Sequence, residues 1–445
     1  RGGGAEELVR AVWACASLRL GDEAVNRKLL GLASAHTASC SASELANLAW
    51  AAATLNAPEH LAQMVPVVAE RVGQMEPQGV AMVVWAVAAA EVQGDALLAA
   101  AEPCVRQGAH RFSGQGLANV VWAYAKADAA ADTVFMALAP HLLAATPRLS
   151  HKGCTSAVWA YAHLRYEADS LVEAVDRRVP ELLAAGVDAE EFVGVAWGAA
   201  VLQTEAPTSF HAVARVAVPR IAEIAPRYLC TLLWSYAVAG RLEGTRELWQ
   251  GALGMDPSAL GEQELSQLFQ VHLAAPADWP RPRQFLEHLA QESVPVRSSA
   301  TAAEVGRTLQ QLLPDQEVAA EFLVCPPLAA VDCSQAVEAE PGQPGGTAAG
   351  CLEGHPSGTR GGLGLLVDLA VEDLRLVVEV DGPTHFMRGS GRRVGECVFK
   401  QRVLEAWGWR VARVVYHDWD LVSTAAGKAA LLRGLLAQTG VETTA

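Results

Sequence analysis

A tryptophan returns at a nearly constant interval through the first half of the chain. Successive steps are 37, 35, 37, 37, 38 and 37 residues, and the positions are Trp13, Trp50, Trp85, Trp122, Trp159, Trp197 and Trp234. Each lies in a similar segment, such as LANVVWAYAKA, and Phe269 takes the same place in a further, degenerate unit. A period of this size predicts a repeat array, in which each unit buries its apolar face only against its neighbours.

Each repeat is predicted to contain two helices. In the fourth repeat, SGQGLANVVWAYAKA and DAAADTVFMALAPHLLAAT both have apolar residues at helical spacing, with polar or glycine-containing joints around them. Two antiparallel helices in 37 residues form an αα-hairpin, and stacked hairpins form an α-solenoid. We therefore expect an α-solenoid over residues 1–280, with the Trp series in the core between neighbouring hairpins.

Composition limits the classes of function. The chain of 445 residues is 51% hydrophobic and 19% charged, which is typical of a folded protein, and its net charge is −15 with only five lysines. Non-specific affinity for nucleic acid comes from dense Lys and Arg, so any nucleic-acid role must depend on local patches or on reading unpaired bases. The nine cysteines contain no CxxC pair, which favours a reduced compartment without a zinc site. No uninterrupted apolar run reaches the length of a membrane span.

The pattern changes after residue 280. Residues 281–333 are expected to hold capping helices and the start of a second domain, with a helix at 299–313 and a strand at 316–324. Residues 334–362 are rich in Gly, Pro and Ala without periodicity, and are predicted to be a flexible insertion. Residues 363–440 are predicted to form a small α/β domain. It would contain an antiparallel hairpin, a helix at 396–409 closed by Gly408, a strand at 409–417 and a last helix at 425–438.

Three carboxylates converge in the predicted hairpin. Asp368 lies on its first strand, and Glu379 and Asp381 lie two residues apart on its second strand, so that they point to the same face. Clustered carboxylates can bind Mg²⁺ or Mn²⁺, which polarises phosphate and activates water. The residues themselves leave another interpretation open, because acids at strand ends are often solvated or cap a turn.

The segments VDLAVEDLRLVVEVDGPTHF and FKQRVLEAWGWRVARVVYHDW resemble the RAP domain. The matching features are the VD pair, the run E-V-D-G-P-x-H-F, a Lys that opens a helix, the L-x-x-x-G turn and a closing Trp, within residues 365–422. RAP domains resemble PD-(D/E)xK endonuclease folds and commonly follow helical repeats of this length, namely the heptatricopeptide and octotricopeptide arrays and the fast-kinase-like organellar proteins. The resemblance implies RNA binding, and processing or stabilisation of mitochondrial or chloroplast transcripts.

The resemblance transfers onto a nuclease site only in part. Asp368 matches the first acid and Glu379 the second, but Asp381 occupies the position where an active PD-(D/E)xK enzyme usually has Lys. Lys400, on the following helix, could supply a displaced positive charge. The resemblance therefore leaves open a metal-dependent RNA endonuclease with an atypical D…E-x-D site, in which Asp368, Glu379 and Asp381 hold the metal.

Two sets of residues are candidates for contact with RNA. One is a basic cluster that could clamp a phosphate backbone, since Arg forms a good phosphate fork: His385, Arg388, Arg392, Arg393, Lys400 and Arg402, followed along the chain by Arg410 and Arg413. The alternative for this cluster is a solvated loop, with His385 as a hydrogen bond that stabilises the turn.

The second set lies three residues before each Trp, where the residue type varies: Arg10, Asn47, Met82, Asn119, Ser156, Gly194 and Thr231. A varying polar residue at a fixed repeat position is what modular base reading needs, and Asn47, Asn119, Ser156 and Thr231 are the candidates. The alternative is that these side chains cap helices or bond between helices. Tyr124, Tyr161 and Tyr236 could stack on bases, although core packing is favoured for them.

The sequence thus predicts an organellar RNA-binding factor, with a single-stranded transcript held by the repeats. Two alternatives stay open, a metal-dependent RNA endonuclease and a protein-binding scaffold. Since the chain begins with Arg1, we expect it to be a fragment or a processed form. The RNA target, the choice between mitochondrion and chloroplast, and the oligomeric state are not specified by the sequence.

Overall fold

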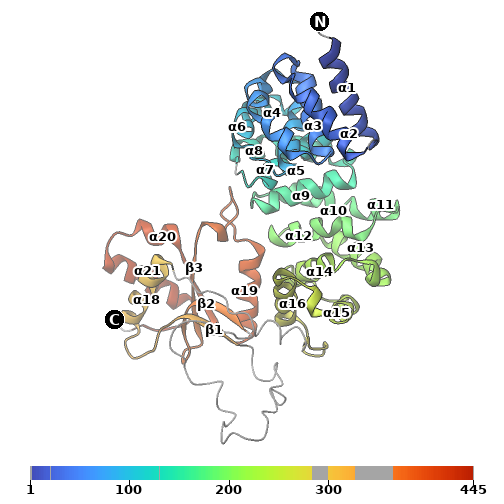
Figure 1. Cartoon of the computed structure of the whole chain (residues 1–445). Coiled ribbons are helices and arrows are strands. Elements are labelled where there is room, and N and C mark those ends of the chain that lie inside the picture. Colours follow the sequence, from blue (N-terminus) through green and yellow to red (C-terminus); the bar gives the residue numbers. More distant parts are fainter. Residues whose placement is uncertain (1–2, 21, 130, 283–298, 326–363, 444–445) are drawn as a thin grey trace, which may run out of the picture. The chain divides into compact units, whose positions relative to one another are not determined.

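The computed structural model describes residues 3–20, 22–129, 131–282, 299–325 and 364–443 (Figure 1). The insertion predicted at 334–362 and the segment 283–298 lie outside the described residues. The rest is mainly helical up to residue 274, with a four-stranded sheet near the C-terminus. None of the described helices is long and apolar enough to cross a membrane.

The predicted helical hairpins are confirmed. The first helix of each repeat, here called an A-helix, is one of α1 (Gly3–Leu18), α3 (Ala42–Thr54), α5 (Pro77–Ala89), α7 (Gly114–Lys126), α9 (His151–His163), α12 (Val193–Val201), α14 (Pro226–Val238) and α16 (Glu262–Ala274). The second, or B-helix, is one of α2 (Glu23–Ser34), α4 (Pro58–Arg71), α6 (Asp95–Gly108), α8 (Asp132–Ala145), α10 (Asp169–Asp176) with α11 (Val179–Ala184), α13 (Pro207–Ala217) and α15 (Arg246–Leu253).

The chain forms two compact units. Unit 1 contains residues 1–220 together with 387–392, and unit 2 contains residues 221–386 together with 393–445. In unit 1 each A-helix contacts the next one, from α1 through α9 to α12. The B-helices contact one another in the same order. The A-helices therefore form one continuous layer of unit 1, and the B-helices form another.

The backbone repeats with the same period as the Trp series. Six residues after each Trp the chain adopts a positive φ, which ends the A-helix, at Arg19, Asn56, Glu91, Asp128, Arg165, Gln203 and Gly240. After Asp128, for example, the amide of Ala129 donates to the carbonyl of Tyr124 across the helix end. This left-handed conformation is common at helix ends and favours glycine. Of the seven positions, however, only Gly240 is a glycine.

The assignment of the Trp series to the core is wrong for most of its members. Trp234 is 5% exposed, but Trp13 is 44% exposed, and the intervening five Trp side chains are partly exposed. The core between the helices is formed instead by their neighbours, such as Val121, Ala123 and Tyr124.

The three tyrosines that follow the Trp residues are buried, as the core assignment predicted. Tyr124 and Tyr161 are each at most 2% exposed, and each hydroxyl donates over 2.7 Å to a carbonyl of the preceding B-helix, at Leu98 and Phe135. Tyr236 is also 2% exposed. These rings are therefore not available to stack on a base.

The sheet of unit 2 has the strand order β1 (Ala319–Val324), β2 (Leu365–Val371), β3 (Leu376–Asp381), β4 (Arg410–Val415). β1–β2 and β2–β3 are antiparallel, and β3–β4 is parallel. The hairpin expected between residues 365 and 381 is therefore confirmed. The strand expected at 409–417 ends at Val415, because Tyr416–Leu421 forms the short helix α20.

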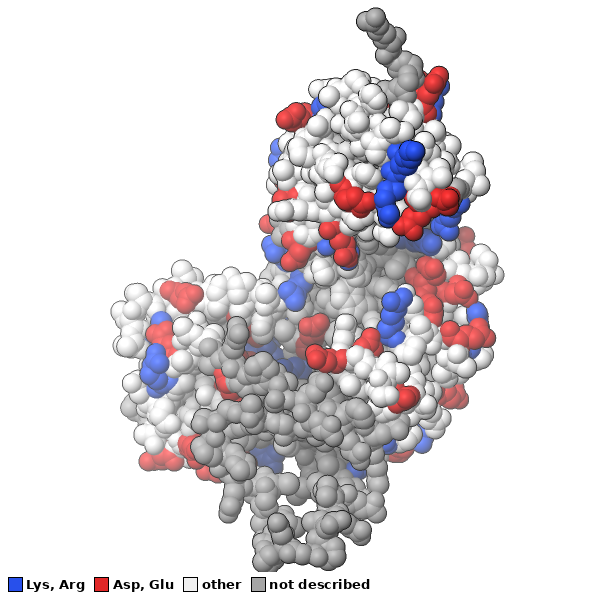
Figure 2. Space-filling view, in the orientation of Figure 1, with Lys and Arg blue, Asp and Glu red and all other residues white. Residues whose placement is uncertain are grey.

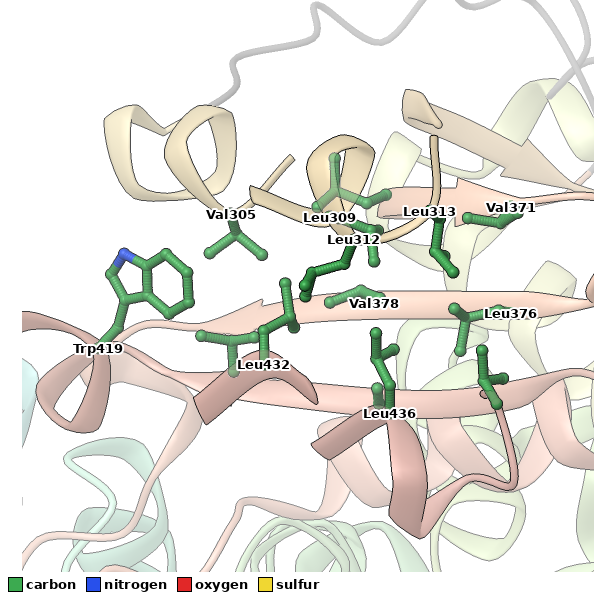
Figure 3. Packing of buried hydrophobic residues seen from close by; sticks show 14 residues of the cluster. Val305, Leu309, Leu312, Leu313, Val371, Leu376, Val378, Trp419, Leu432 and Leu436 are labelled. Atoms are coloured by element: carbon green, nitrogen blue, oxygen red, sulfur yellow. The ribbon is translucent and has the colours of Figure 1, made fainter. Parts of the chain in front are cut away.

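Helices cover both faces of this sheet. α18 (Ala300–Leu312) and α21 (Ala425–Gln438) pack on one face, where Val305, Leu309, Leu432 and Leu436 are buried against strand residues such as Val378 (Figure 3). α19 (Gly395–Ala406) packs on the other face through Leu404. α19 runs from the end of β3 to the start of β4, and Gly408, with φ +83°, ends it as predicted.

Candidate functional site in the C-terminal domain

Asp368 takes part in the pairing of its own sheet. β2 pairs with β3 through residues 369–371 and 376–378. At residue 368, just before this paired stretch, a side chain takes over from the backbone. There the carboxylate of Asp368 accepts the amide of Val380 at 2.7 Å. The acid is partly exposed. One of its oxygens is therefore committed to holding β3.

Glu379 forms a buried ion pair with Lys400. Glu379 is 3% exposed, and the ammonium of Lys400 on α19 lies 2.8 Å from each carboxylate oxygen. Burial raises the pKa of Glu379, Lys400 counteracts this, and the nearby Asp368 adds to the rise. Lys400 thus supplies positive charge beside the second acid, as the sequence suggested.

Asp381 is fully buried and surrounded by basic side chains. A guanidinium nitrogen of Arg413 lies 2.7 Å from one carboxylate oxygen, and Nδ1 of His385 lies 3.0 Å from the same oxygen. Arg393 approaches the other oxygen at 3.5 Å. Burial alone would raise the pKa of Asp381, but the hydrogen bond from His385 and the charge of Arg413 outweigh it and lower that pKa.

His385 is held as a cation. Its hydrogen bond to Asp381, and a contact of 3.5 Å with the thiol of Cys397, raise the pKa of His385 to about 10. An imidazole that is charged throughout the physiological range is a poor general acid or base at neutral pH. The geometry matches the alternative given above for His385, a bond that stabilises the turn after β3.

The expected metal site needs correction. Among the described residues, no group of three or more His, Cys, Asp or Glu side chains is arranged to hold a metal ion, and Asp368, Glu379 and Asp381 do not form one. The physical reason is that Lys400 occupies the carboxylate of Glu379, whereas Arg413, His385 and Arg393 occupy that of Asp381. These internal cations supply the charge that Mg²⁺ would supply, so the residues do not fit a three-carboxylate metal centre.

Several residues of the predicted basic cluster have internal partners. Arg402 is directed away from the acids and donates to the carbonyls of Ala237 and Val238, the last residues of α14 within unit 2. Its guanidinium lies against Gly240, where an added Cβ would come within 3.2 Å of it. Arg393 donates to Gln401 at 3.2 Å in addition to its contact with Asp381.

Arg388 and Arg392 belong to the segment 387–392, which is part of unit 1. Arg388 donates to the carbonyl of Leu164, and Arg392 lies 2.7 Å from Asp169 and 3.2 Å from Glu167. Both arginines remain about half exposed, at 48% and 40% of their side chains. Ion pairs this exposed are worth between about 0 and 1 kcal/mol, so these two arginines are the members of the cluster that can most cheaply change partner.

The residues three positions before each Trp lie on the A-helices. They differ in exposure and in hydrogen bonding. Asn119 accepts a hydrogen bond from Gln115 at 2.8 Å, and Thr231 donates to Gln267 of the following repeat at 3.3 Å. Asn47 and Ser156 are partly exposed, and their side chains have no hydrogen-bond partner among the described residues. Thr231 therefore fits the alternative of a bond between helices, whereas Asn47, Asn119 and Ser156 lie at an accessible surface.

The sequence did not predict the role of Arg413, which joins Asp381 to α19. Arg413 is 7% exposed, and besides Asp381 it binds Gln401 and the carbonyl of Cys397, so that it ties β4 and α19 to the end of β3. Parallel pairing sets Arg413 opposite Glu379. The position of Arg413 between apolar residues in VARVV was the available signal, because a charge in a buried strand requires a partner.

Comparison with known proteins identifies this domain. The family profile of the RAP domain matches residues 378–435. A RAP domain-containing chloroplastic protein of Oryza sativa subsp. japonica is 37% identical over 57 residues, which cover 13% of this chain and 9% of that protein. The chain therefore contains a RAP domain, preceded by helical repeats. The match spans less than a tenth of the length of that relative.

Proposed function

We propose that this protein is an RNA-binding factor that acts in the processing, stability or translation of chloroplast or mitochondrial transcripts. In this proposal the A-helix layer holds single-stranded RNA, and the RAP domain contacts its backbone. RAP domains are generally RNA-binding, and the chloroplastic location of the rice protein supports an organelle.

One observation carries the proposal. Successive A-helices of unit 1 contact each other, so that the same repeat positions recur side by side on one layer. Asn47, Asn119 and Ser156 belong to this recurring series and are partly exposed. A linear row of equivalent sites matches single-stranded RNA, whose bases differ along the chain. Proteins that read one base in each helical repeat use such a row.

The backbone contact is assigned to Arg388 and Arg392, because their present ion pairs are exposed and weak. Lys400, Arg402 and Arg393 have internal partners, and we assign them mainly to holding the domain together. The proposed contacts are few, which agrees with a net charge of −15.

A metal-dependent RNA endonuclease is the second candidate. Two observations favour it. Lys400 contacts Glu379, which brings a lysine beside the second acid. The domain also has a mixed sheet with helices on both faces, an architecture compatible with the PD-(D/E)xK type. What weighs against it is the engagement of both buried carboxylates by internal cations. A protein-binding scaffold is the third candidate.

The test is binding and cleavage of labelled single-stranded RNA by the purified chain, with Mg²⁺, Mn²⁺ or EDTA. The proposal expects binding that does not depend on metal, without cleavage. The paired variant Asp368→Asn/Glu379→Gln keeps the shapes of the two side chains. Once circular dichroism shows that it is folded, it should bind equally well. Metal-dependent cleavage that this variant abolishes would establish the endonuclease instead. No RNA binding by the wild-type chain would favour the scaffold.

A further inference from the structure

We propose that the partly exposed indoles of the A-helix layer in unit 1 are the surfaces on which unpaired RNA bases stack. This inference rests on the proposed function and deepens it, since it names the side chains that hold the RNA and the part of the RNA that they hold.

The first observation is the position of the indoles on their helices. In α3, α5, α7 and α9, the Trp belongs to a stripe with members seven and three residues before it and four residues after it, here called the Trp stripe. All sixteen members are partly or fully exposed, although the residues immediately beside each Trp are buried. The members are Ser43, Asn47, Trp50, Thr54; Gln78, Met82, Trp85, Ala89; Gln115, Asn119, Trp122, Lys126; Lys152, Ser156, Trp159 and His163.

The stripes of neighbouring repeats lie next to each other. α3 contacts α5, α5 contacts α7, and α7 contacts α9. Ser150, the N-cap of α9, donates to Gln115 of the α7 stripe at 3.3 Å. Packed helices lie about 8–10 Å apart, so one indole recurs at about that distance along the layer. Some arrays of helical repeats bind one RNA base in each repeat.

Charge favours RNA as the occupant. The sixteen stripe residues include two lysines and no Asp or Glu, in a chain with 49 acidic residues. α5, α7, α9 and α12 contain no acid at all, whereas the B-helices α4, α6, α8 and α10 each do. α3 contains one acid, Glu44, which bonds to its N-cap Ser41. Glu91 pairs with Lys126 at 2.8 Å, and Glu191 lies 3.8 Å from His151. Acidic residues are thus displaced from the surface that a polyanion would approach.

The side chains present are suited to bases more than to phosphates. On α9 the imidazole of His163 stacks on the indole of Trp159, with ring centroids 4.7 Å apart and an angle of 18° between the planes. Indole faces bind any base by stacking, and the Asn, Gln and Ser side chains beside them can bond to base edges. Among the described residues of the face in view, Figure 2 shows Lys and Arg scattered among acidic residues.

The last Trp of the series provides an internal contrast. In unit 2, Trp234 is 5% exposed, and its ring nitrogen donates to Gln270 of the following repeat at 2.8 Å. This indole is closed off by its neighbour, so the proposal excludes it from the stacking surface.

The experiment measures binding of the full chain to fluorescein-labelled 20-nucleotide oligouridine and oligoadenosine by fluorescence anisotropy. The variant Trp122→Ala/Trp159→Ala removes two stacking faces, and Trp122→Phe/Trp159→Phe keeps an aromatic ring at both positions. Met136→Ala, at a residue 74% exposed on the B-helix α8, is the matched control for loss of an exposed apolar side chain. Circular dichroism and the thermal midpoint show whether each variant is folded.

Stacking on one aromatic side chain contributes about 5- to 150-fold in affinity, so the double Ala variant should bind about 25-fold or more weakly. The double Phe variant should stay within about fivefold of the wild type, Met136→Ala should be unchanged, and a duplex of the same length should not compete. With two lysines on the stripes and few arginine contacts, the plot of log affinity against log salt should have a slope shallower than about −3.

The outcomes separate the inference from the function on which it rests. No binding of either oligonucleotide by the wild-type chain would overturn the proposed function and the inference together. Binding by the wild type that the double Ala variant retains would overturn only the inference. If the Ala variant is unfolded, the Phe variant and the tryptophan emission of the wild-type chain provide the test. Wild-type binding of oligouridine without quenching of that emission would also overturn stacking.

Discussion

The ammonium of Lys400 lies 2.8 Å from both carboxylate oxygens of Glu379, in a position where Glu379 is 3% exposed. The carboxylate is away from water and depends on Lys400 for its counter-charge, whereas the Lys400 side chain is 26% exposed. This pair fastens α19 to β3, and it uses two of the four residues suggested for catalysis, the others being Asp368 and Asp381.

Replacement of Lys400 should destabilise the RAP domain strongly. Lys400→Met leaves a buried carboxylate without its partner, which typically costs about 3–5 kcal/mol. The control Glu379→Gln/Lys400→Met removes both charges and should recover much of that loss. Urea unfolding, followed by the emission of the tryptophans, measures the difference. Equal stability of the single and double variants would contradict a coupled pair.

The cost of Lys400→Met should also depend on pH. Burial already raises the pKa of Glu379 in the folded state, and removal of Lys400 raises it further. A carboxyl with a raised folded-state pKa favours folding at pH values below its unfolded pKa, and this contribution is lost as the pH rises through the folded pKa. The variant should therefore be less impaired at pH 5 than at pH 8. Unfolding curves at the two pH values would show this, and a penalty that grows toward acid pH would refute it.

His385 should contribute stability in a defined pH window. Its pKa is raised to about 10 in the folded state by Asp381 and Cys397, from an ordinary value near 6.5. The contribution is fully present below about pH 6.5 and is lost as the pH rises through about 10. The penalty of His385→Gln should therefore be larger at pH 6 than at pH 10. Titration of the His385 ring proton by NMR gives the pKa directly, and a value near 6.5 would contradict the ion pair.

Arg402 should act on stability more than on RNA. It donates to the last carbonyls of α14, so Arg402→Ala removes a charged cap and is expected to cost about 1–2 kcal/mol. The exposed Arg410, which donates to the carbonyl of Gly440, is the matched control, and Arg410→Ala should cost less. Binding of RNA by folded Arg402→Ala should change less than about threefold. A large loss of affinity with unchanged stability would restore Arg402 to the RNA-binding set.

Glycine at the left-handed helix ends should stabilise the array. Asp128 is exposed with φ +51°, a conformation that costs a residue with a Cβ about 1 kcal/mol. Asp128→Gly should therefore raise the free energy of unfolding by about 0.5–1 kcal/mol. The control Lys126→Gly places glycine at the last residue of α7 and removes the exposed pair with Glu91, so it should lower the free energy of unfolding. Thermal unfolding of both variants measures the effect, and destabilisation by Asp128→Gly would be the contrary result.

The sequence predicted the helical hairpins, the strand pair and the RAP domain, because each has a local pattern or a specific motif. It misplaced the indoles, since A-helices such as α5 are apolar almost all round and the pattern alone does not identify their exposed side. A signal existed: Gln115, Asn119 and Lys126 have the spacing that puts them on the same side as Trp122. The partners of Arg402 could not be predicted, because they are carbonyls of residues more than 160 positions earlier in the chain.

The constant interval from each Trp to its positive-φ residue also bears on how such an array can change. Repeat lengths vary between 35 and 38 residues, yet that interval is six in all seven repeats, so every insertion or deletion falls outside it. Length differences are thus absorbed in the B-helices and joints, while the spacing of the indoles on the A-helix layer depends only on how helices pack. The array can therefore gain or lose loop residues without a change in the spacing of the indoles that we propose as stacking surfaces.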